Sequence, residues 1–182
     1  AVRNIAYDPV YDALWVGNWD TPLTLVSKTG ATLATIPNPG LSGMYGTAYD
    51  SWSDGGPYLW IFDQGMDQGA PQYIHQLNLA TGLLTGVSHD VTLEFPAVLG
   101  IAGGLFTAVN IVPGKASIGG VLQGTPDMFF VYELAVAADP TDPNPPTNVT
   151  AYSDYTTPSQ MALNWSDPTT LVNGTPINPT DF

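Results

Sequence analysis

The stretch Ile5-Ala6-Tyr7-Asp8, followed by Leu14-Trp15-Val16, returns later in the chain as Thr47-Ala48-Tyr49-Asp50, followed by Leu59-Trp60-Ile61. Each copy continues into an alternating segment and a Thr-Gly turn, at Thr29-Gly30 and at Thr81-Gly82. The offset between the copies grows from about 42 residues at the tyrosines to about 52 at these turns, so the second copy is enlarged. The repeated tryptophans, Trp15 and Trp60, are expected to fill the core between sheets.

A period of this length, with four short strands and tight turns per copy, is typical of one blade of a β-propeller. In the first copy, apolar alternation predicts strands at 2–7, 13–16, 23–27 and 31–36. The second copy runs from Met44 to about Val91, with insertions at 51–57 and 64–72. No stretch repeats apolar residues at helical spacing for three turns, so helix is expected to be nearly absent.

A third and weaker unit is expected before residue 136. Gly103 to Thr107 stands where the Leu-Trp strand of the other copies lies, 128–134 alternates like an outer strand, and 112–126 reads as a Gly-rich loop. About three blades are therefore visible, whereas a closed ring needs at least about four. Either further blades precede Ala1, or another chain completes the ring, or the ring is not closed.

Residues 137–146 form a Pro-rich, stiff connector. After it, Pro146-Thr147-Asn148-Val149-Thr150-Ala151 and Met161-Ala162-Leu163-Asn164-Trp165 resemble the first two strands of a fibronectin type III domain. Trp165 matches the core tryptophan of the second strand in that family. The resemblance implies an all-β organisation with blades at 1–136, a linker at 137–146 and a partial fibronectin type III-like sandwich at 147–182.

The blade phrases carry a second resemblance. Ala6-Tyr7-Asp8-Pro9, Leu14-Trp15-Val16-Gly17-Asn18, Tyr58-Leu59-Trp60 and Leu79-Ala80-Thr81-Gly82 are similar to propeller segments of large secreted bacterial proteins. In those proteins, such a propeller is often followed by fibronectin-like domains and a C-terminal sorting segment. The resemblance implies an extracellular or cell-surface location.

Charge excludes several classes of partner. Three Lys+Arg against sixteen Asp+Glu give a formal net charge of -13, which repels polyanions, so neither nucleic acid nor an anionic membrane surface is expected to bind. No apolar run approaches the ~20 residues of a membrane span, so no membrane insertion is expected. The chain has no cysteine for disulfides or thiol chemistry. Because the first residues read directly into a strand, the given N-terminus is expected to be internal to a longer precursor.

No catalytic motif is present. His75 and His89 are the only histidines, and neither has a histidine at i+4 or a cysteine with which to bind zinc. His75 falls in an alternating strand and is expected to be structural, while His89-Asp90 reads as a turn pair. Glu94 and Glu133 are the only glutamates, and the sequence does not place two carboxylates across a cleft as glycoside hydrolysis requires. The chain is therefore expected not to be an enzyme.

Two tryptophans in predicted turns are the candidate ligand-binding residues. Trp19 lies beside Asp20, and Trp52 lies close to Asp54. Each ring could stack on a sugar while the neighbouring acid accepts hydrogen bonds from its hydroxyl groups. The alternative is that each ring packs over the edge of its own blade.

Calcium is the one cofactor that the sequence allows. Asp63 and Asp67 belong to a Gly-rich insertion and offer the hard oxygen ligands that Ca²⁺ takes. The linker acids Asp139 and Asp142 offer a second clamp. The alternative in both places is turn-forming aspartates in a solvated loop.

These features together predict a non-catalytic extracellular binding or scaffolding module within a larger secreted or cell-surface bacterial protein. It would recognise a glycan or a protein through propeller loops on one rim. One alternative is an accessory region of a secreted peptidase or glycosidase whose catalytic domain lies outside this chain. Another is a subunit of a surface assembly, because open blade edges invite self-association by strand addition.

Overall fold

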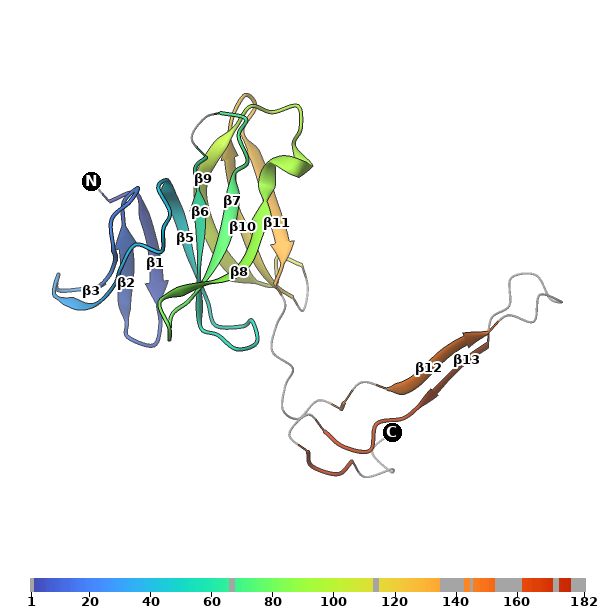
Figure 1. Cartoon of the computed structure of the whole chain (residues 1–182). Helices are drawn as coiled ribbons and strands as arrows, with labels where there is room; N and C mark the ends of the chain where they lie inside the picture. Colours follow the sequence, from blue (N-terminus) through green and yellow to red (C-terminus); the bar gives the residue numbers. More distant parts are fainter. Residues whose placement is uncertain are drawn as a thin grey trace. The chain divides into compact units, whose positions relative to one another are not determined.

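The computed structural model describes residues 2–65, 68–112, 115–134, 143–144, 146–152, 162–171 and 174–177. Within these ranges the regular structure consists of thirteen strands and one short 3-10 helix, which confirms the prediction of an all-β chain (Figure 1). None of the helical structure described in these ranges is long and apolar enough to cross a membrane. The chain divides into two compact units, Ala1–Val136 and Ala137–Phe182, each of which is described by itself.

The first repeat forms one four-stranded antiparallel sheet in the order β1-β2-β3-β4. Its strands are β1 (Asn4–Asp8), β2 (Ala13–Gly17), β3 (Leu23–Ser27) and β4 (Thr32–Ile36). Burial alternates along β1, β2 and the start of β3, as expected for strands that place every second side chain in a core. The strands that the alternation predicts in this copy are therefore present, with ends that shift by one or two residues.

The second repeat forms a sheet of the same kind, in the order β5-β6-β7-β8. Its strands are β5 (Met44–Asp50), β6 (Tyr58–Asp63), β7 (Tyr73–Asn78) and β8 (Leu83–Asp90). The 3-10 helix η1 (Val91–Glu94) follows directly, and the Asp90 side chain caps it by accepting a hydrogen bond from the Thr92 N–H. Both repeats thus fold as simple up-and-down meanders, and the first strand of each contains the repeated Tyr-Asp motif.

The third sheet differs from the prediction. It has the order β11-β10-β9, with β9 (Ile101–Val109), β10 (Ala116–Gln123) and β11 (Met128–Glu133). Gly103 to Thr107 therefore belongs to the first strand of this unit, and most of the expected loop at 112–126 is its second strand. A Cβ on Gly120 would stand 2.7 Å from the ring of Phe130, so this glycine is needed for close packing within a strand and does not signal a turn.

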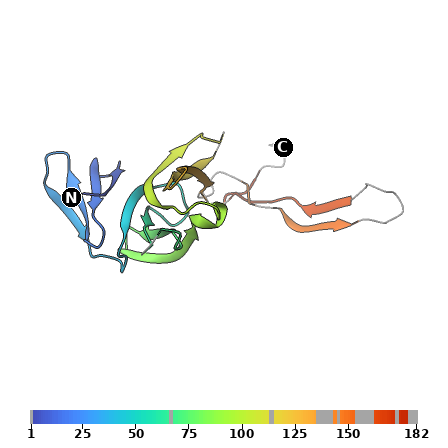
Figure 2. The ribbon, with the colours of Figure 1, turned by 90° about the horizontal axis from the view of Figure 1, so that it is seen from above.

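The three sheets pack face to face through their first strands, since β5 contacts both β1 and β9. In Figure 2 the blue first sheet, the cyan-to-green second sheet and the yellow third sheet follow one another. Alternate residues of β6 enter two separate cores: Leu59 and Ile61 join the core with the first sheet, and Trp60 and Phe62 join the core with the third. The second sheet is therefore buried on both faces, which explains the nearly continuous burial of β6.

The second compact unit contains an antiparallel pair, β12 (Thr147–Tyr152) and β13 (Ala162–Ser166). The side chain of Trp165 is 55% exposed, and its indole Nε1 donates to Asp167 Oδ1 at 2.9 Å. The expectation that Trp165 lies in a core is wrong for this unit, because the described residues include no second sheet that would cover it. Residues 137–142 and 145 of the expected linker lie outside the described residues.

Candidate functional site

The turn that follows β5 is held by one buried carboxylate, that of Asp50. Its Oδ1 accepts hydrogen bonds from the backbone N–H groups of Trp52 at 2.9 Å and Ser53 at 3.1 Å. Its Oδ2 accepts from the indole Nε1 of Trp60 at 2.9 Å. Because Asp50 is fully buried, this arrangement fixes the start of the loop that carries Trp52.

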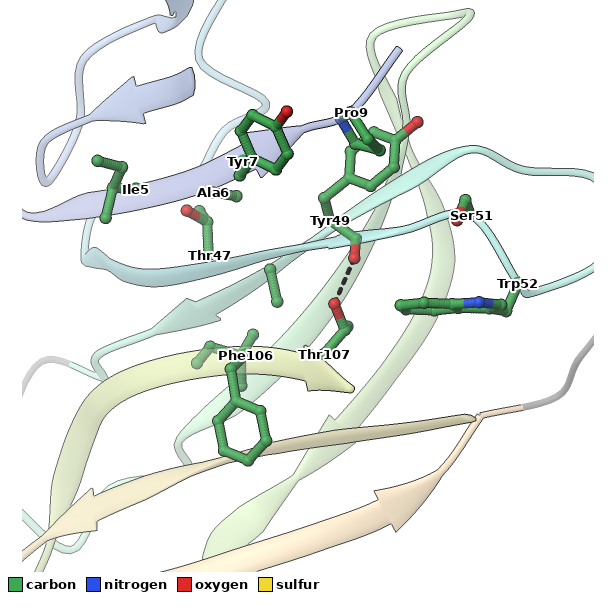
Figure 3. Close-up of a pocket in the computed structure, with 12 residues that line it drawn as sticks. Ile5, Ala6, Tyr7, Pro9, Thr47, Tyr49, Ser51, Trp52, Phe106 and Thr107 are labelled. Carbon is green, nitrogen blue, oxygen red and sulfur yellow. Dashed lines mark hydrogen bonds between the residues drawn. The ribbon is translucent and has the colours of Figure 1, made fainter. Parts of the chain in front are cut away.

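Trp52 lines a cavity of about 350 Å³ between the first strands of the three sheets, here called the first-strand cavity. Figure 3 shows Thr47 and Tyr49 projecting from β5 toward β1, with Phe106 and Thr107 below them on β9. Its aromatic and hydroxyl-bearing lining residues are Tyr7, Tyr49, Trp52, Phe106, Thr47, Ser51 and Thr107. Four aromatic rings and three hydroxyl groups of serine and threonine therefore border one space of a size that suits a small ligand.

Several polar groups in this lining are not used within the protein. Thr47 is 2% exposed, and its hydroxyl has no hydrogen-bond partner among the described residues. Among the described residues, neither the indole Nε1 of Trp52 nor the hydroxyl of Tyr49 has a hydrogen-bond partner. Burial, together with the carboxylates of Asp8 and Asp50, raises the pKa of Tyr49, so this hydroxyl keeps its proton at neutral pH.

Two further groups of the cavity are already engaged. The hydroxyl of Thr107 donates to the carbonyl oxygen of Tyr49 at 2.5 Å and so ties β9 to β5 (Figure 3). The hydroxyl of Tyr7 donates to Asp12 Oδ1 at 2.6 Å. The cavity thus offers aromatic faces together with unpaired donors and acceptors, a combination that matches the alternating apolar and hydroxyl-bearing surfaces of a sugar.

The second candidate tryptophan lies elsewhere. The carbonyl of Trp19 accepts a hydrogen bond from the N–H of Met44 at 2.9 Å, which places Trp19 at the start of β5, whereas Trp52 follows the end of that strand. The ring of Trp19 meets Tyr45 edge-on at 5.9 Å, and the guanidinium of Arg3 lies 4.8 Å from its centroid. The two tryptophan loops are therefore at opposite ends of β5 and do not share a rim.

The acids beside these tryptophans are also separated from the first-strand cavity. Asp20 is exposed in the turn after Trp19. Asp54 is exposed as well, and it lines a different cavity between the second and third sheets, where its carbonyl oxygen accepts from the hydroxyl of Tyr58 at 2.7 Å. Trp52 and Asp54 therefore line different cavities.

The residues expected to bind calcium do not assemble into a site within the described part of the chain. Asp63 Oδ1 accepts the N–H of Gly43 at 2.8 Å, and burial raises the pKa of its carboxyl group. Asp67, Asp139 and Asp142 lie outside the described residues. No group of three or more His, Cys, Asp or Glu side chains that could hold a metal ion is found among the residues that the structure describes.

One polar cluster is not predicted by the sequence. His89 Nε2 lies 2.9 Å from Glu94 Oε1, and the hydroxyl of Tyr132 donates to Glu94 Oε2 at 3.0 Å. Burial, followed by the hydrogen bond to Glu94, raises the pKa of Tyr132. The turn pair expected at His89-Asp90 is wrong, because His89 is the last-but-one residue of β8 and meets the edge of the Tyr132 ring. Glu94 and Tyr132 are 38 residues apart, so no local sequence signal could have joined them.

Two of the three cations of the chain are ion-paired, and the third, Arg3, lies over an aromatic ring. Arg3 lies over Trp19, Lys28 pairs with Asp12, and Lys115 Nζ lies 2.7 Å from Glu133 Oε1. The net charge of -13 is therefore not balanced by an accessible cationic patch. This charge distribution favours neutral or cationic ligands over anionic ones.

A comparison with protein-family models finds no match for this chain, and a comparison with curated protein sequences finds none either.

Proposed function

We propose that this chain is a non-catalytic binding module of a larger secreted or cell-surface bacterial protein and that it binds a neutral glycan in the first-strand cavity. The observation that carries the proposal is the meeting of four aromatic rings with unpaired hydroxyl and indole donors in one cavity. The ligand is neutral because an anionic sugar would be repelled by the net charge of -13.

The architecture proposed for this module is a segment of a β-propeller followed by the beginning of a fibronectin type III-like domain. Three consecutive up-and-down sheets with adjacent first strands support the propeller. The antiparallel pair β12 and β13 supports the second domain. In a propeller the first strands line the central channel, and the proposed glycan site would open onto it.

The test is binding of the whole chain to arrays of neutral and acidic oligosaccharides, followed by titration of the best neutral oligosaccharide. Trp52→Ala should weaken binding at least about tenfold, because a buried indole ring is among the contacts that contribute most to binding free energy. Trp19→Ala is the matched control, since this ring lies at the other end of β5, and its affinity should stay at the wild-type value. Preferential binding of acidic glycans, or equal loss in both variants, would refute the proposal.

Assembly is a second candidate function, favoured by the outer faces of the first and third sheets. Ile5 is 55% exposed on β1, and Phe129 is 62% exposed on the third sheet. Apolar rings and side chains on both outer faces would be covered if further sheets packed there. Light scattering of the isolated chain tests this function: assembly requires a mass that rises with concentration, and a strict monomer excludes it.

A further inference from the structure

We propose that the cavity between the second and third sheets, here called the intersheet cavity, binds an alkylammonium group carried on an apolar body. It has a volume of about 540 Å³ and lies between β6, β7 and β8 on one side and β10 and β11 on the other. Its main aromatic and aliphatic walls are Tyr58, Trp60, Ile74, Ile118 and Tyr132. This volume and this apolar lining are those of a small-molecule or side-chain pocket.

The aromatic walls have no free hydrogen-bond donors. Trp60 Nε1 donates to Asp50 Oδ2 at 2.9 Å, and the hydroxyl of Tyr58 donates to the carbonyl oxygen of Asp54 at 2.7 Å. The hydroxyl of Tyr132 donates to Glu94 Oε2 at 3.0 Å. A ligand therefore meets the faces and edges of these rings, which attract apolar groups and cations rather than sugar hydroxyls.

The charged groups at this cavity are predominantly acidic. Asp54 is exposed, and its carboxylate makes no hydrogen bond or ion pair within the described part of the chain. Glu133 also lines the cavity, but Lys115 is paired with it at 2.7 Å. His89 lines the cavity and is bound to Glu94 at 2.9 Å. Asp54, a lining residue whose carboxylate is unpaired in the described part of the chain, thus favours an organic cation over a neutral or anionic ligand.

The intersheet cavity differs from the first-strand cavity in the chemistry that it offers. The first-strand cavity has unpaired hydroxyl and indole donors from Thr47, Tyr49 and Trp52, whereas the aromatic donors of the intersheet cavity are all occupied. The alkylammonium group could belong to a free amine or to the side chain of a lysine in a partner protein. Both present a short methylene chain that ends in a cation, and the experiment separates them.

The experiment titrates two pairs of probes into the ¹⁵N-labelled chain and follows the indole N–H of Trp60 and the amide of Ser88. The first pair is n-hexylammonium and n-hexanol, and the second is a Gly-Lys-Gly peptide and its Gly-norleucine-Gly counterpart, both blocked at the ends. We expect each cation to bind about fivefold or more tightly than its neutral partner. Binding of the amine alone assigns a small-molecule ligand, and binding of the lysine peptide as well assigns a protein partner. Equal binding of cation and neutral probe overturns the proposal.

Two exposed acids provide the matched control. Asp54→Asn should weaken ammonium binding about fivefold, as expected for one exposed ion pair. Asp20→Asn removes the same charge from a turn of the first sheet, which does not line the intersheet cavity. This substitution should leave the affinity for ammonium unchanged. An equal effect of both substitutions would show that only the overall field attracts the cation, and would overturn the site.

The ring of Tyr132 provides an independent test. Tyr132→Phe keeps the aromatic face and loses only the bond to Glu94, so ammonium binding should persist, whereas Tyr132→Leu should lose most of it. If both variants bind as the wild type does, the aromatic wall has no role and the proposal fails. Should Tyr132→Leu not fold, the Asp54 and Asp20 variants still decide, since both acids are exposed.

Discussion

The indole Nε1 of Trp15 donates a hydrogen bond to Asp8 Oδ2 at 3.0 Å. The same bond recurs in the second sheet between Trp60 and Asp50 at 2.9 Å. In both sheets the other oxygen of the aspartate accepts backbone N–H groups of the following turn, with the Val10 N–H at 2.9 Å in the first. The motif that repeats in the sequence thus has one structural role in both sheets. A buried aspartate at the end of the first strand accepts hydrogen bonds from the following turn and from the tryptophan of the second strand.

The first prediction concerns this buried aspartate. Asp8→Asn places an amide NH₂ against either the indole N–H of Trp15 or the backbone N–H of Val10, so that two donors face each other inside the core. We expect a loss of roughly 1–3 kcal/mol in the free energy of unfolding, measured by urea denaturation, with a similar loss for Asp50→Asn. Combining Asp8→Asn with Trp15→Phe should cost less than the sum of the two single changes. An effect no larger than that of the exposed Asp20→Asn would contradict this role.

The second prediction concerns the close approach of β5 and β9. A Cβ on Gly46 would stand 2.5 Å from the carbonyl oxygen of Gly103 and 2.9 Å from the N of Leu105, both backbone atoms. Gly46→Ala must therefore separate these first strands, and we expect it to destabilise the fold by about 1–3 kcal/mol in thermal or chemical denaturation. Gly104→Ala is the control, because a Cβ there meets nothing within 4 Å. Equal stability of the two variants would contradict the contact.

The third prediction concerns Gln72, which is fully buried between the second and third sheets. Its Oε1 accepts from the N–H of Ala102 at 2.8 Å and of Gly65 at 3.2 Å, and its Nε2 donates to the carbonyl of Ala70 at 3.1 Å. Gln72→Met has a similar volume but leaves the Ala102 N–H unpaired, so the unfolding free energy should fall by about 1–3 kcal/mol. Gln123→Met, at an exposed position of β10, should leave it almost unchanged.

The fourth prediction concerns pH. Burial raises the pKa of Asp63 in the folded chain above its value in the unfolded chain. The stabilising contribution of the protonated group is therefore complete below the unfolded pKa and is lost as pH rises through the folded pKa. Asp63→Asn is neutral at every pH, and its amide oxygen still accepts the Gly43 N–H. Its stability relative to wild type should rise between about pH 3 and pH 7 in urea denaturation, and a constant difference would contradict the assignment.

The strands of the first two sheets could be predicted from the sequence because the pattern that identifies them lies among neighbouring residues. Leu23 and Leu25 are buried while Thr24 between them is not, and this period of two is visible in the letters alone. The turn chemistry of the two Tyr-Asp phrases is local too, since each aspartate accepts hydrogen bonds from residues two or three positions later. Such short-range patterns identify the two meanders and their core tryptophans.

The third sheet could not be read from the sequence in the same way because its second strand contains Gly119 and Gly120. Glycine signals a turn when only the sequence is known, but here both glycines stand where a side chain would strike a neighbouring aromatic ring or the carbonyl oxygen of Gly104. The reason for each glycine therefore lies in another strand. A requirement set by a residue ten or more positions away cannot be predicted from the neighbouring sequence alone.

The sequence by itself determined that the chain is all-β, that a Tyr-Asp and Leu-Trp motif is repeated, and that its acidity disfavours anionic ligands. Strand alternation, repeats and charge are properties of neighbouring residues or of composition. Only the tertiary structure decided that Trp19 and Trp52 lie at opposite ends of β5, that Trp52 shares a cavity with Tyr7 and Phe106, and that His89, Glu94 and Tyr132 meet. Those relationships depend on how three sheets pack on one another, and packing joins residues that no spacing along the chain connects.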